Sequence, residues 1–311
     1  MIKKVASILI FNTFSPNTPR RRVVLFAGRS GSGKTELWRH AESLVYGCKS
    51  NRIVIADAST MAPEGWCGSN ANHISDVIRD NHLADGFSHI LVLDEFDKCC
   101  QPAMSSSTDY NKLFQDGLLK LFDGDTVTYG SGEKTVTLDA NMITIVLCGA
   151  FSDIYELKDT IKKEKEESEV KTKRPIGFMT EPEPDTKPKE PEPEEHDGIT
   201  PEDLIAYGMR SEIAGRISKI VELEPPNLET MERIGVQVTR KLSKSYGIDI
   251  AVTDGLMHEI AQKALDSGLG ARYIRGQIQS RLDDLMFIDP YAHGYTLQKE
   301  PEKEKGCEMQ P

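Results

Sequence analysis

Eight consecutive residues form a glycine-rich loop of the kind that holds phosphate groups. They match the pattern GxxxxGK[ST] throughout: Gly28, Arg29, Ser30, Gly31, Ser32, Gly33, Lys34 and Thr35. Glycine allows backbone N–H groups to turn towards phosphate oxygens without a Cβ clash. Lys34 adds a positive charge for the β- and γ-phosphates, and Thr35 adds a hydroxyl ligand for Mg²⁺. These residues therefore predict a site for a nucleoside triphosphate with Mg²⁺.

Two acidic residues follow an apolar run further along the chain. Residues 90–93 have the composition of a buried strand, and Asp94 and Glu95 come directly after them. We expect Asp94 to hold Mg²⁺ through water beside Thr35, and Glu95 to act as the general base on the attacking water. A solvated acid at a strand end is common by itself, but together with the phosphate loop the pair favours hydrolysis.

Strand and helix patterns alternate around these groups and would position them. Residues 126–129 and 135–138 flank Gly130-Ser131-Gly132, which predicts a hairpin. Strands that alternate with helices indicate a parallel sheet with helices on both faces, an α/β fold. The expected strands are 23–26, 53–56, 90–93, 143–147 and 219–223, and the expected helices begin near 34, 75, 111 and 201.

The composition excludes several classes of protein. The net charge of −11 disfavours non-specific binding of nucleic acid, whose phosphates would be repelled. No apolar run approaches the roughly 20 residues that span a bilayer, so we expect no membrane segment. Residues 1–11 resemble a signal peptide only weakly, and we expect a helix leading into the first domain. The six cysteines form no CxxC pair, which argues against a zinc finger and suits reduced thiols in the cytoplasm.

Changes in composition divide the chain into domains. Residues 1–224 form the expected large domain, and within it residues 158–199 combine runs of charge with Pro and Glu, which predicts a flexible acidic loop. Pro225 and Pro226 mark a boundary. Three amphipathic helices and a short strand near 248–252 then predict a small, mostly helical domain over 225–290, and residues 291–311 predict a disordered tail.

An ordered set of short segments resembles the ClpX family, the AAA+ unfoldase of the Clp protease, and more distantly HslU. The resemblance covers about residues 2–286. It implies an AAA+ P-loop domain with a helical lid, assembled as a homo-hexamer that uses ATP to thread protein substrates through a central pore. The segments that carry it are 57–60, 65–68, 93–98, 118–124, 148–151, 176–178, 201–205, 215–216 and 270–272.

The resemblance implies roles for three further residues. Trp66 matches the aromatic pore-loop position, where a bulky side chain between two glycines grips the substrate; a Trp within the core is the alternative. Residues 99–111 match the second pore loop, or form an ordinary surface loop. Arg216 matches the arginine finger that reaches the γ-phosphate of the neighbouring subunit, and Arg272 matches the sensor arginine of the lid. Without the resemblance, both arginines would be read as surface ion-pair residues.

One tripeptide predicts a protein partner. Ile176, Gly177 and Phe178 stand where the ClpX family keeps its docking loop for a ClpP-type peptidase. The glycine would let the two apolar side chains enter one pocket, and the polar flanks give them nothing local to bury against. Isolated exposed apolar residues are also common without any role.

The chain departs from the family in several places. No residues match its amino-terminal zinc domain or its adenine-covering segment, so a shortened form is one expectation. Residues 129–134 replace its basic substrate-entry loop, and Cys148 stands where many AAA+ proteins have a polar sensor. Two other functions remain open: a P-loop kinase, which would leave the helical domain with Arg272 unexplained, and a nucleotide-dependent regulator that assembles without threading chains.

Overall fold

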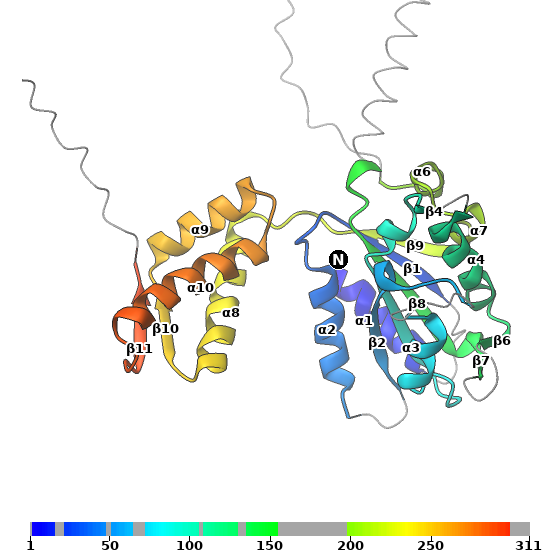
Figure 1. Cartoon of the computed structure of the whole chain (residues 1–311), viewed down its shortest axis with the longest axis horizontal. Coiled ribbons are helices and arrows are strands. Elements are labelled where there is room, and N and C mark those ends of the chain that lie inside the picture. Colours follow the sequence, from blue (N-terminus) through cyan, green and yellow to red (C-terminus); the bar gives the residue numbers. More distant parts are fainter. Residues whose placement is uncertain are drawn as a thin grey trace, which may run out of the picture. The chain divides into compact units, whose positions relative to one another are not determined.

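The structure is a computed structural model that describes residues 2–15, 22–47, 51–64, 72–105, 108–129, 135–154 and 198–298. The chain divides into two compact units, shown in Figure 1. The first comprises Met1–Gly28 and Lys34–Leu223, and the second comprises Arg29–Gly33 and Glu224–Pro311.

A five-stranded sheet forms the centre of the first unit. Its strand order is β2-β3-β8-β1-β9, and every neighbouring pair is parallel, as the alternation of patterns predicts. All carboxyl ends therefore lie at one edge of the sheet. The strands are β1 (Val23–Ala27), β2 (Ile53–Asp57), β3 (His89–Asp94), β8 (Ile143–Gly149) and β9 (Ile217–Glu222).

Helices cover both faces of this sheet, because successive side chains of each buried strand point to opposite faces. In β1, Val24 and Phe26 pack in one cluster with side chains of α1 (Ile2–Phe14) and α2 (Lys34–Val45). Val23, Leu25 and Ala27 belong to the other cluster, on the opposite face. The helices on that face are α3 (Ile74–Asp80), α4 (Tyr110–Asp123), α6 (Pro201–Tyr207) and α7 (Ser211–Ala214). The α/β fold class predicted from the sequence is confirmed.

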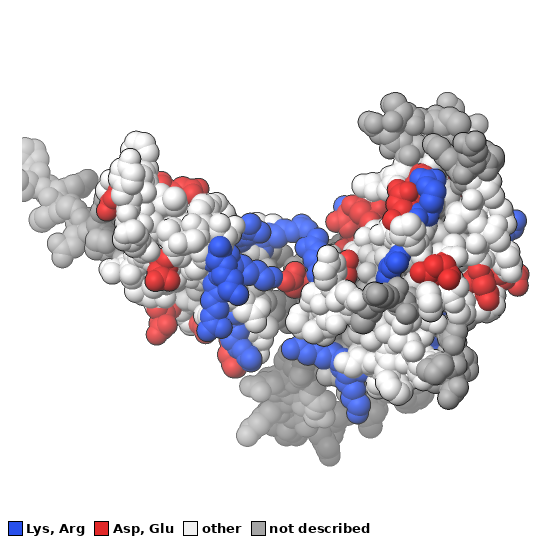
Figure 2. Space-filling model, turned by 90° about the horizontal axis from the view of Figure 1, so that it is seen from below, with Lys and Arg blue, Asp and Glu red and all other residues white. Residues whose placement is uncertain are grey.

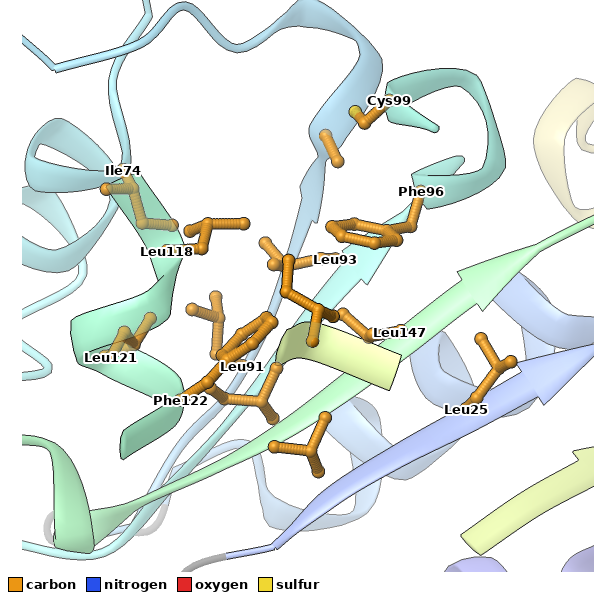
Figure 3. Packing of buried hydrophobic residues seen from close by; sticks show 14 of the residues in the cluster. Leu25, Ile74, Leu91, Leu93, Phe96, Cys99, Leu118, Leu121, Phe122 and Leu147 are labelled. Atoms are coloured by element: carbon orange, nitrogen blue, oxygen red, sulfur yellow. The ribbon is translucent and has the colours of Figure 1, made fainter. Parts of the chain in front are cut away.

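The larger cluster ties α4 to the strand that carries the acidic pair. Figure 3 shows Leu118, Leu121 and Phe122 of α4 facing Leu91 and Leu93 of β3. All five side chains are buried. Truncation of a buried Phe to Ala costs about 3–5 kcal/mol, so this contact holds α4 firmly against the sheet.

Caps fix the ends of the helices near the acidic pair. The Asp109 side chain accepts from the N–H groups of Asn111 and Lys112 at the start of α4, and Gly124 ends the helix in the left-handed conformation. Thr200 and Asp203 form a capping box at α6, with Pro201 in its first turn. The α6 start agrees with the sequence pattern.

Short elements connect the main ones. Three 3₁₀ turns, η1 (Ala58–Thr60), η2 (Phe96–Cys99) and η4 (Ala140–Met142), follow β2, β3 and β7. The expected hairpin forms from β6 (Thr126–Tyr129) and β7 (Val136–Asp139). Residues 99–111, predicted as a loop, contain a small antiparallel pair, β4 (Met104–Ser105) and β5 (Thr108–Asp109).

The predicted acidic loop lies almost wholly outside the described residues. Its last two positions, 198–199, are described, and they are ordered against the sheet. Ile199 is buried, and its N–H donates to Glu222 Oε1 at 2.6 Å. The expected loop thus ends in two described residues, of which Ile199 contributes an apolar side chain to the core.

Three helices and a two-stranded sheet form the second unit. They are α8 (Leu228–Tyr246), α9 (Asp254–Asp266), α10 (Ala271–Ile288), β10 (Asp249–Val252) and β11 (Gly294–Leu297). The expected disordered tail over 291–311 is wrong for residues 294–297, which pair in parallel with β10. Tyr295 and Leu297 are the buried side of this strand, and their apolar alternation is short and set in polar sequence. Among the described residues, no helix is long and apolar enough to cross a membrane.

Candidate active site

The hydroxyl of Thr35 and the carboxylate of Asp94 meet at the carboxyl edge of the sheet. Thr35 lies in the first turn of α2 and Asp94 is the last residue of β3; Oγ1 donates to Oδ2 over 2.6 Å. Mg²⁺ prefers oxygen ligands and is usually held by one or two protein groups together with phosphates. These two oxygens fit that donor set. No cluster of three His, Cys, Asp or Glu side chains in the described part of the chain would hold a metal ion by itself.

The phosphate loop has a backbone that glycine makes possible. Gly31 and Gly33 have φ values of +80° and +89°, in the left-handed region that other residues rarely adopt. The Ser32 N–H donates to the Arg29 carbonyl over 3.1 Å, which closes a turn inside the loop. A loop of this shape presents successive N–H groups to an anion.

Lys34 is buried at the end of this loop. Its side chain is 8% exposed, and Nζ donates to the Gly28 carbonyl. Burial lowers the pKa of Lys34, while Cys148, Asp94 and Asp97 oppose the shift. A phosphate group beside Nζ would supply further negative charge, which favours the charged ammonium.

Glu95 follows Asp94 in an unusual backbone conformation. Its φ of +56° and ψ of +31° lie in the left-handed region, which costs of the order of 1–3 kcal/mol for a residue with a side chain and is found most often at functional sites. The Glu95 N–H donates to Asp94 Oδ1 over 3.0 Å. The carboxylate accepts from Lys98 Nζ and from Ser59 Oγ, the latter at 3.3 Å. Two carboxylates, those of Asp94 and Glu95, therefore follow one another at this edge, where the first could bind a metal ion and the second could accept a proton.

Sequence reasoning gave no role to the groups that hold Glu95. Ser59 follows β2, and its Oγ also donates to Asp57 Oδ1 over 2.6 Å. Asp57 and Asp94 are partners in the register of β2 and β3. The sequence does show polar residues after both β2 and β3. Only the strand order shows that the carboxyl ends of these two strands are neighbours.

Asp97 and Gly149 lie in close contact beside Lys34. Burial raises the pKa of Asp97, against the N–H groups of Ala150 and of Asp97 itself and against Lys34. A Cβ at Gly149 would lie 2.4 Å from the Phe151 ring and 2.9 Å from Asp97 Oδ1, so only glycine fits between them. Cys148 is buried on β8, and burial raises the pKa of its thiol, which is therefore neutral.

Arg216 lies away from the Thr35–Asp94 pair. It directly precedes β9, whose first residue, Ile217, pairs with Val23 at the start of β1, whereas the phosphate loop follows the end of β1. The five residues of β1 span roughly 15 Å, so Arg216 is at the opposite edge of the sheet. Its Nε donates to Asp123 Oδ1 over 2.6 Å, and Nη1 donates to the Glu212 carbonyl.

The remaining predicted site residues belong to the second unit or lie outside the described residues. Arg272 belongs to the second unit, where it is exposed in the first turn of α10 and lines a surface groove with Arg275 and Asp283. On the face shown in Figure 2, basic side chains form a band across the second unit. Trp66 and the tripeptide Ile176, Gly177 and Phe178 lie outside the described residues.

Comparison with known families gives two matches that together span most of the chain. Residues 20–220 match the AAA domain of the Cdc48 subfamily. Residues 217–299 match the C-terminal, D2-small domain of ClpB protein. The second match covers the helices of the second unit and β11.

Curated relatives share the name of an ATP-dependent Clp protease ATP-binding subunit, ClpX. The relative from Treponema denticola is 26% identical over 94% of this chain and 74% of its own length. ClpX 2 from Wolinella succinogenes is 29% identical over 88% of this chain and 67% of its length, and ClpX from Porphyromonas gingivalis is 24% identical over 88% and 68%. The resemblance inferred from the sequence is confirmed.

Proposed function

Because the chain belongs to the AAA domain family, we propose that this ATPase is a ClpX-type unfoldase that threads protein substrates through a hexameric pore. As a Clp-type AAA protein it binds and hydrolyses ATP. The observation that carries the proposal is the meeting of Thr35, Asp94 and Glu95 at one edge of the sheet. A kinase would need an acceptor site in place of a base that activates water.

The site residues divide the work of hydrolysis. The phosphate loop and Lys34 bind the β- and γ-phosphates, and Thr35 and Asp94 would hold Mg²⁺, whose charge neutralises the phosphate oxygens. Glu95 accepts a proton from water as the water oxygen attacks the γ-phosphorus. The bond from that phosphorus to the bridging oxygen breaks, which yields ADP and phosphate. Ser59 and Lys98 orient the Glu95 carboxylate through the contacts described above.

The position of Arg216 supports the proposal of a ring. A guanidinium at the opposite edge of the sheet from its own phosphate loop is poorly placed to act in its own subunit. In a ring, the same residue is available to the γ-phosphate of the next subunit, where it stabilises charge in the transition state. Arg272 of the helical lid would contact phosphate within its own subunit.

The remaining assignments extend the proposal to substrates and partners. Residues 1–224 would form the ATPase domain and 225–290 the lid. Trp66 would grip substrate in the pore, with residues 99–111 as a second pore loop. Ile176, Gly177 and Phe178 would dock on a ClpP-type peptidase, in keeping with the Clp protease named for the relatives. A motor of this kind would work in the cytoplasm.

Unfolding of a stable fluorescent protein with an unstructured tail tests the proposal. The parent should extinguish its fluorescence with ATP and not with ADP. Trp66→Ala should unfold it several-fold more slowly at an unchanged ATPase rate, because grip requires a bulky side chain and hydrolysis does not. Tyr46→Ala, which removes an aromatic that is 90% exposed on the first unit, is the matched control. No ATP-dependent loss by the parent contradicts the unfoldase, and equal rates for Trp66→Ala contradict the pore role.

A further inference from the structure

Gln115 is a buried polar residue that the reaction so far described does not use. It lies on α4 with no exposed surface. Its Nε2 donates to the Cys99 carbonyl over 2.9 Å and to the Gly208 carbonyl over 3.3 Å, and its Oε1 accepts from the Arg210 N–H over 2.8 Å. One side chain of α4 thus bonds to two backbone segments, at Cys99 and at 208–210, that are far apart in the sequence.

These two segments connect the proposed catalytic base to Arg216. Cys99 ends η2, the turn that begins directly after Glu95. Gly208 ends α6 and Arg210 caps the start of α7, and Arg216 follows α7 by two residues. Gln115 therefore bridges the segment after Glu95 and the segment before Arg216 within one subunit.

Close packing makes this bridge stiff. A Cβ on Gly208 would lie 2.1 Å from the Cys100 carbonyl oxygen, so the turn after α6 rests directly on the end of η2. Gly208 also has a φ of +115°, which other residues rarely adopt. A shift of η2 is therefore passed to the turn that leads into α7.

Two ion pairs also connect α4 to the residues at either end of α7. Arg210 Nη2 donates to Asp116 Oδ2 over 2.7 Å, and Arg216 Nε donates to Asp123 Oδ1 over 2.6 Å. Asp116 and Asp123 are seven positions apart, which places them two turns apart on one face of the helix. The helix that carries Gln115 thus holds α7 at both ends, and with it the guanidinium of Arg216.

An apolar side chain at this position would leave the Cys99 and Gly208 carbonyls and the Arg210 N–H without this partner. Burying an amide among apolar groups costs free energy unless all its hydrogen bonds form. Here they form with backbone groups of two separate segments, η2 and the α6–α7 turn, rather than with neighbours on α4. Such an arrangement suits transmission between them.

We propose that Gln115 is a positioning residue that couples the Glu95 segment of a subunit to the placement of its own Arg216 in the neighbouring active site. The inference rests on the proposed role of Arg216 in trans. Loss of the Gln115 hydrogen bonds should therefore lower the turnover that depends on Arg216 and leave nucleotide binding intact.

A double-mutant cycle on the full-length protein tests this. Gln115→Met keeps the volume and removes the hydrogen bonds, and Thr144→Val is the matched control, because Thr144 is equally buried and its Oγ1 bonds Thr13 on the other side of the sheet. Gln115→Met should lower kcat for ATP on the order of tenfold or more, as expected for a misplaced catalytic group. The nucleotide dissociation constant should stay within twofold, and Thr144→Val should keep the parent kcat.

Measurements in the Arg216→Ala background separate the coupling through Gln115 from the trans role of Arg216. Gln115→Met should cause no further loss of kcat there, because its effect passes through Arg216. An unchanged kcat for Gln115→Met, effects that multiply in the double mutant, or an equal loss in Thr144→Val would overturn the coupling alone. A parent kcat in Arg216→Ala would overturn the trans role and the coupling with it. If Gln115→Met does not fold, Gln115→Asn, which keeps an amide but cannot span the same distances, replaces it.

Discussion

Thr35 and Asp94 are separated by 59 positions in the chain, yet Thr35 Oγ1 donates a 2.6 Å hydrogen bond to Asp94 Oδ2. The contact brings the end of the phosphate loop to the end of β3, where Glu95 follows. With the proposed roles, it joins the three parts of a hydrolytic site, which are phosphate binding, metal binding and a base. The first prediction concerns the division of labour among them.

Binding and hydrolysis should separate between Lys34 and Glu95. Lys34→Ala should abolish nucleotide binding, because it removes the charge on the phosphates. Glu95→Gln should keep binding and lower kcat by about 10²–10⁴-fold, the usual contribution of general base catalysis. Nucleotide affinity and ATPase rate measure the two effects, with Lys120→Ala, an exposed lysine on α4, as control. Hydrolysis at the parent rate by Glu95→Gln would show that the base is misassigned.

Arg216 should act only across a subunit boundary. Arg216→Ala should reduce hydrolysis although each subunit still binds nucleotide. Mixing Arg216→Ala subunits with Glu95→Gln subunits should then restore some ATPase activity, at interfaces that join an intact base to an intact arginine. Arg240→Ala, which changes an exposed arginine of α8, should behave as the parent. The absence of rescue in rings shown to be mixed would contradict the trans role.

A ClpP-type peptidase should bind through residues 176–178. Each large apolar anchor is worth on the order of 2 kcal/mol before ordering costs, and six tethered anchors gain by effective concentration. Co-sedimentation with a ClpP from the same cell should therefore be lost in Ile176→Ala/Phe178→Ala. Phe87→Ala, which removes an exposed aromatic side chain of the first unit, should leave binding unchanged. Equal binding by the double mutant, or none by the parent with ATP, would remove the docking proposal.

Acid should destabilise the protein through His89. This residue is fully buried at the start of β3, and its Nε2 contacts Asp85 Oδ1 at 2.8 Å. Burial lowers the pKa of His89 from its ordinary 6.5, with Arg52 adding to the shift and Asp85 opposing it. Since the unfolded chain then binds the proton more readily, the free energy of unfolding is highest above about pH 6.5 and falls below it, by at most about 1.4 kcal/mol per pH unit.

His89→Gln isolates that contribution. The amide can still donate to Asp85 but does not titrate. Denaturant unfolding of the parent and the variant is measured between pH 7 and pH 5. As the pH falls, the free energy of unfolding of the parent should decrease more than that of the variant. Parallel curves for the two proteins would contradict the assignment.

The phosphate loop was predictable because its chemistry is local. Eight consecutive residues match the phosphate-loop pattern, and Asp94 and Glu95 are adjacent at the end of an apolar run. The sheet and its helices followed in the same way, since the period of apolar residues reports which faces are buried. The phosphate loop and each single helix or strand depend on residues that are close in the sequence, whereas the pairing of the strands does not.

Long-range contacts were not predictable. Periodicity does not say which strands are adjacent, so the bond from Ser59 to Glu95 depends on a strand order that the sequence leaves open. The pairing of Arg216 with Asp123 likewise depends on how α4 lies over the sheet. β11 was missed because only two apolar residues, Tyr295 and Leu297, mark it.

Oligomer mass and ATPase rate, measured on one preparation with and without ATP, test the central claim most directly. The account predicts that chains of 34.7 kDa assemble into hexamers in ATP and hydrolyse it, and that Glu95→Gln forms the same hexamer without turnover. A chain that stays monomeric while it hydrolyses ATP at its full rate would contradict the ring. A hexamer that binds ATP without turnover would contradict the motor, and would indicate a nucleotide-dependent regulator instead.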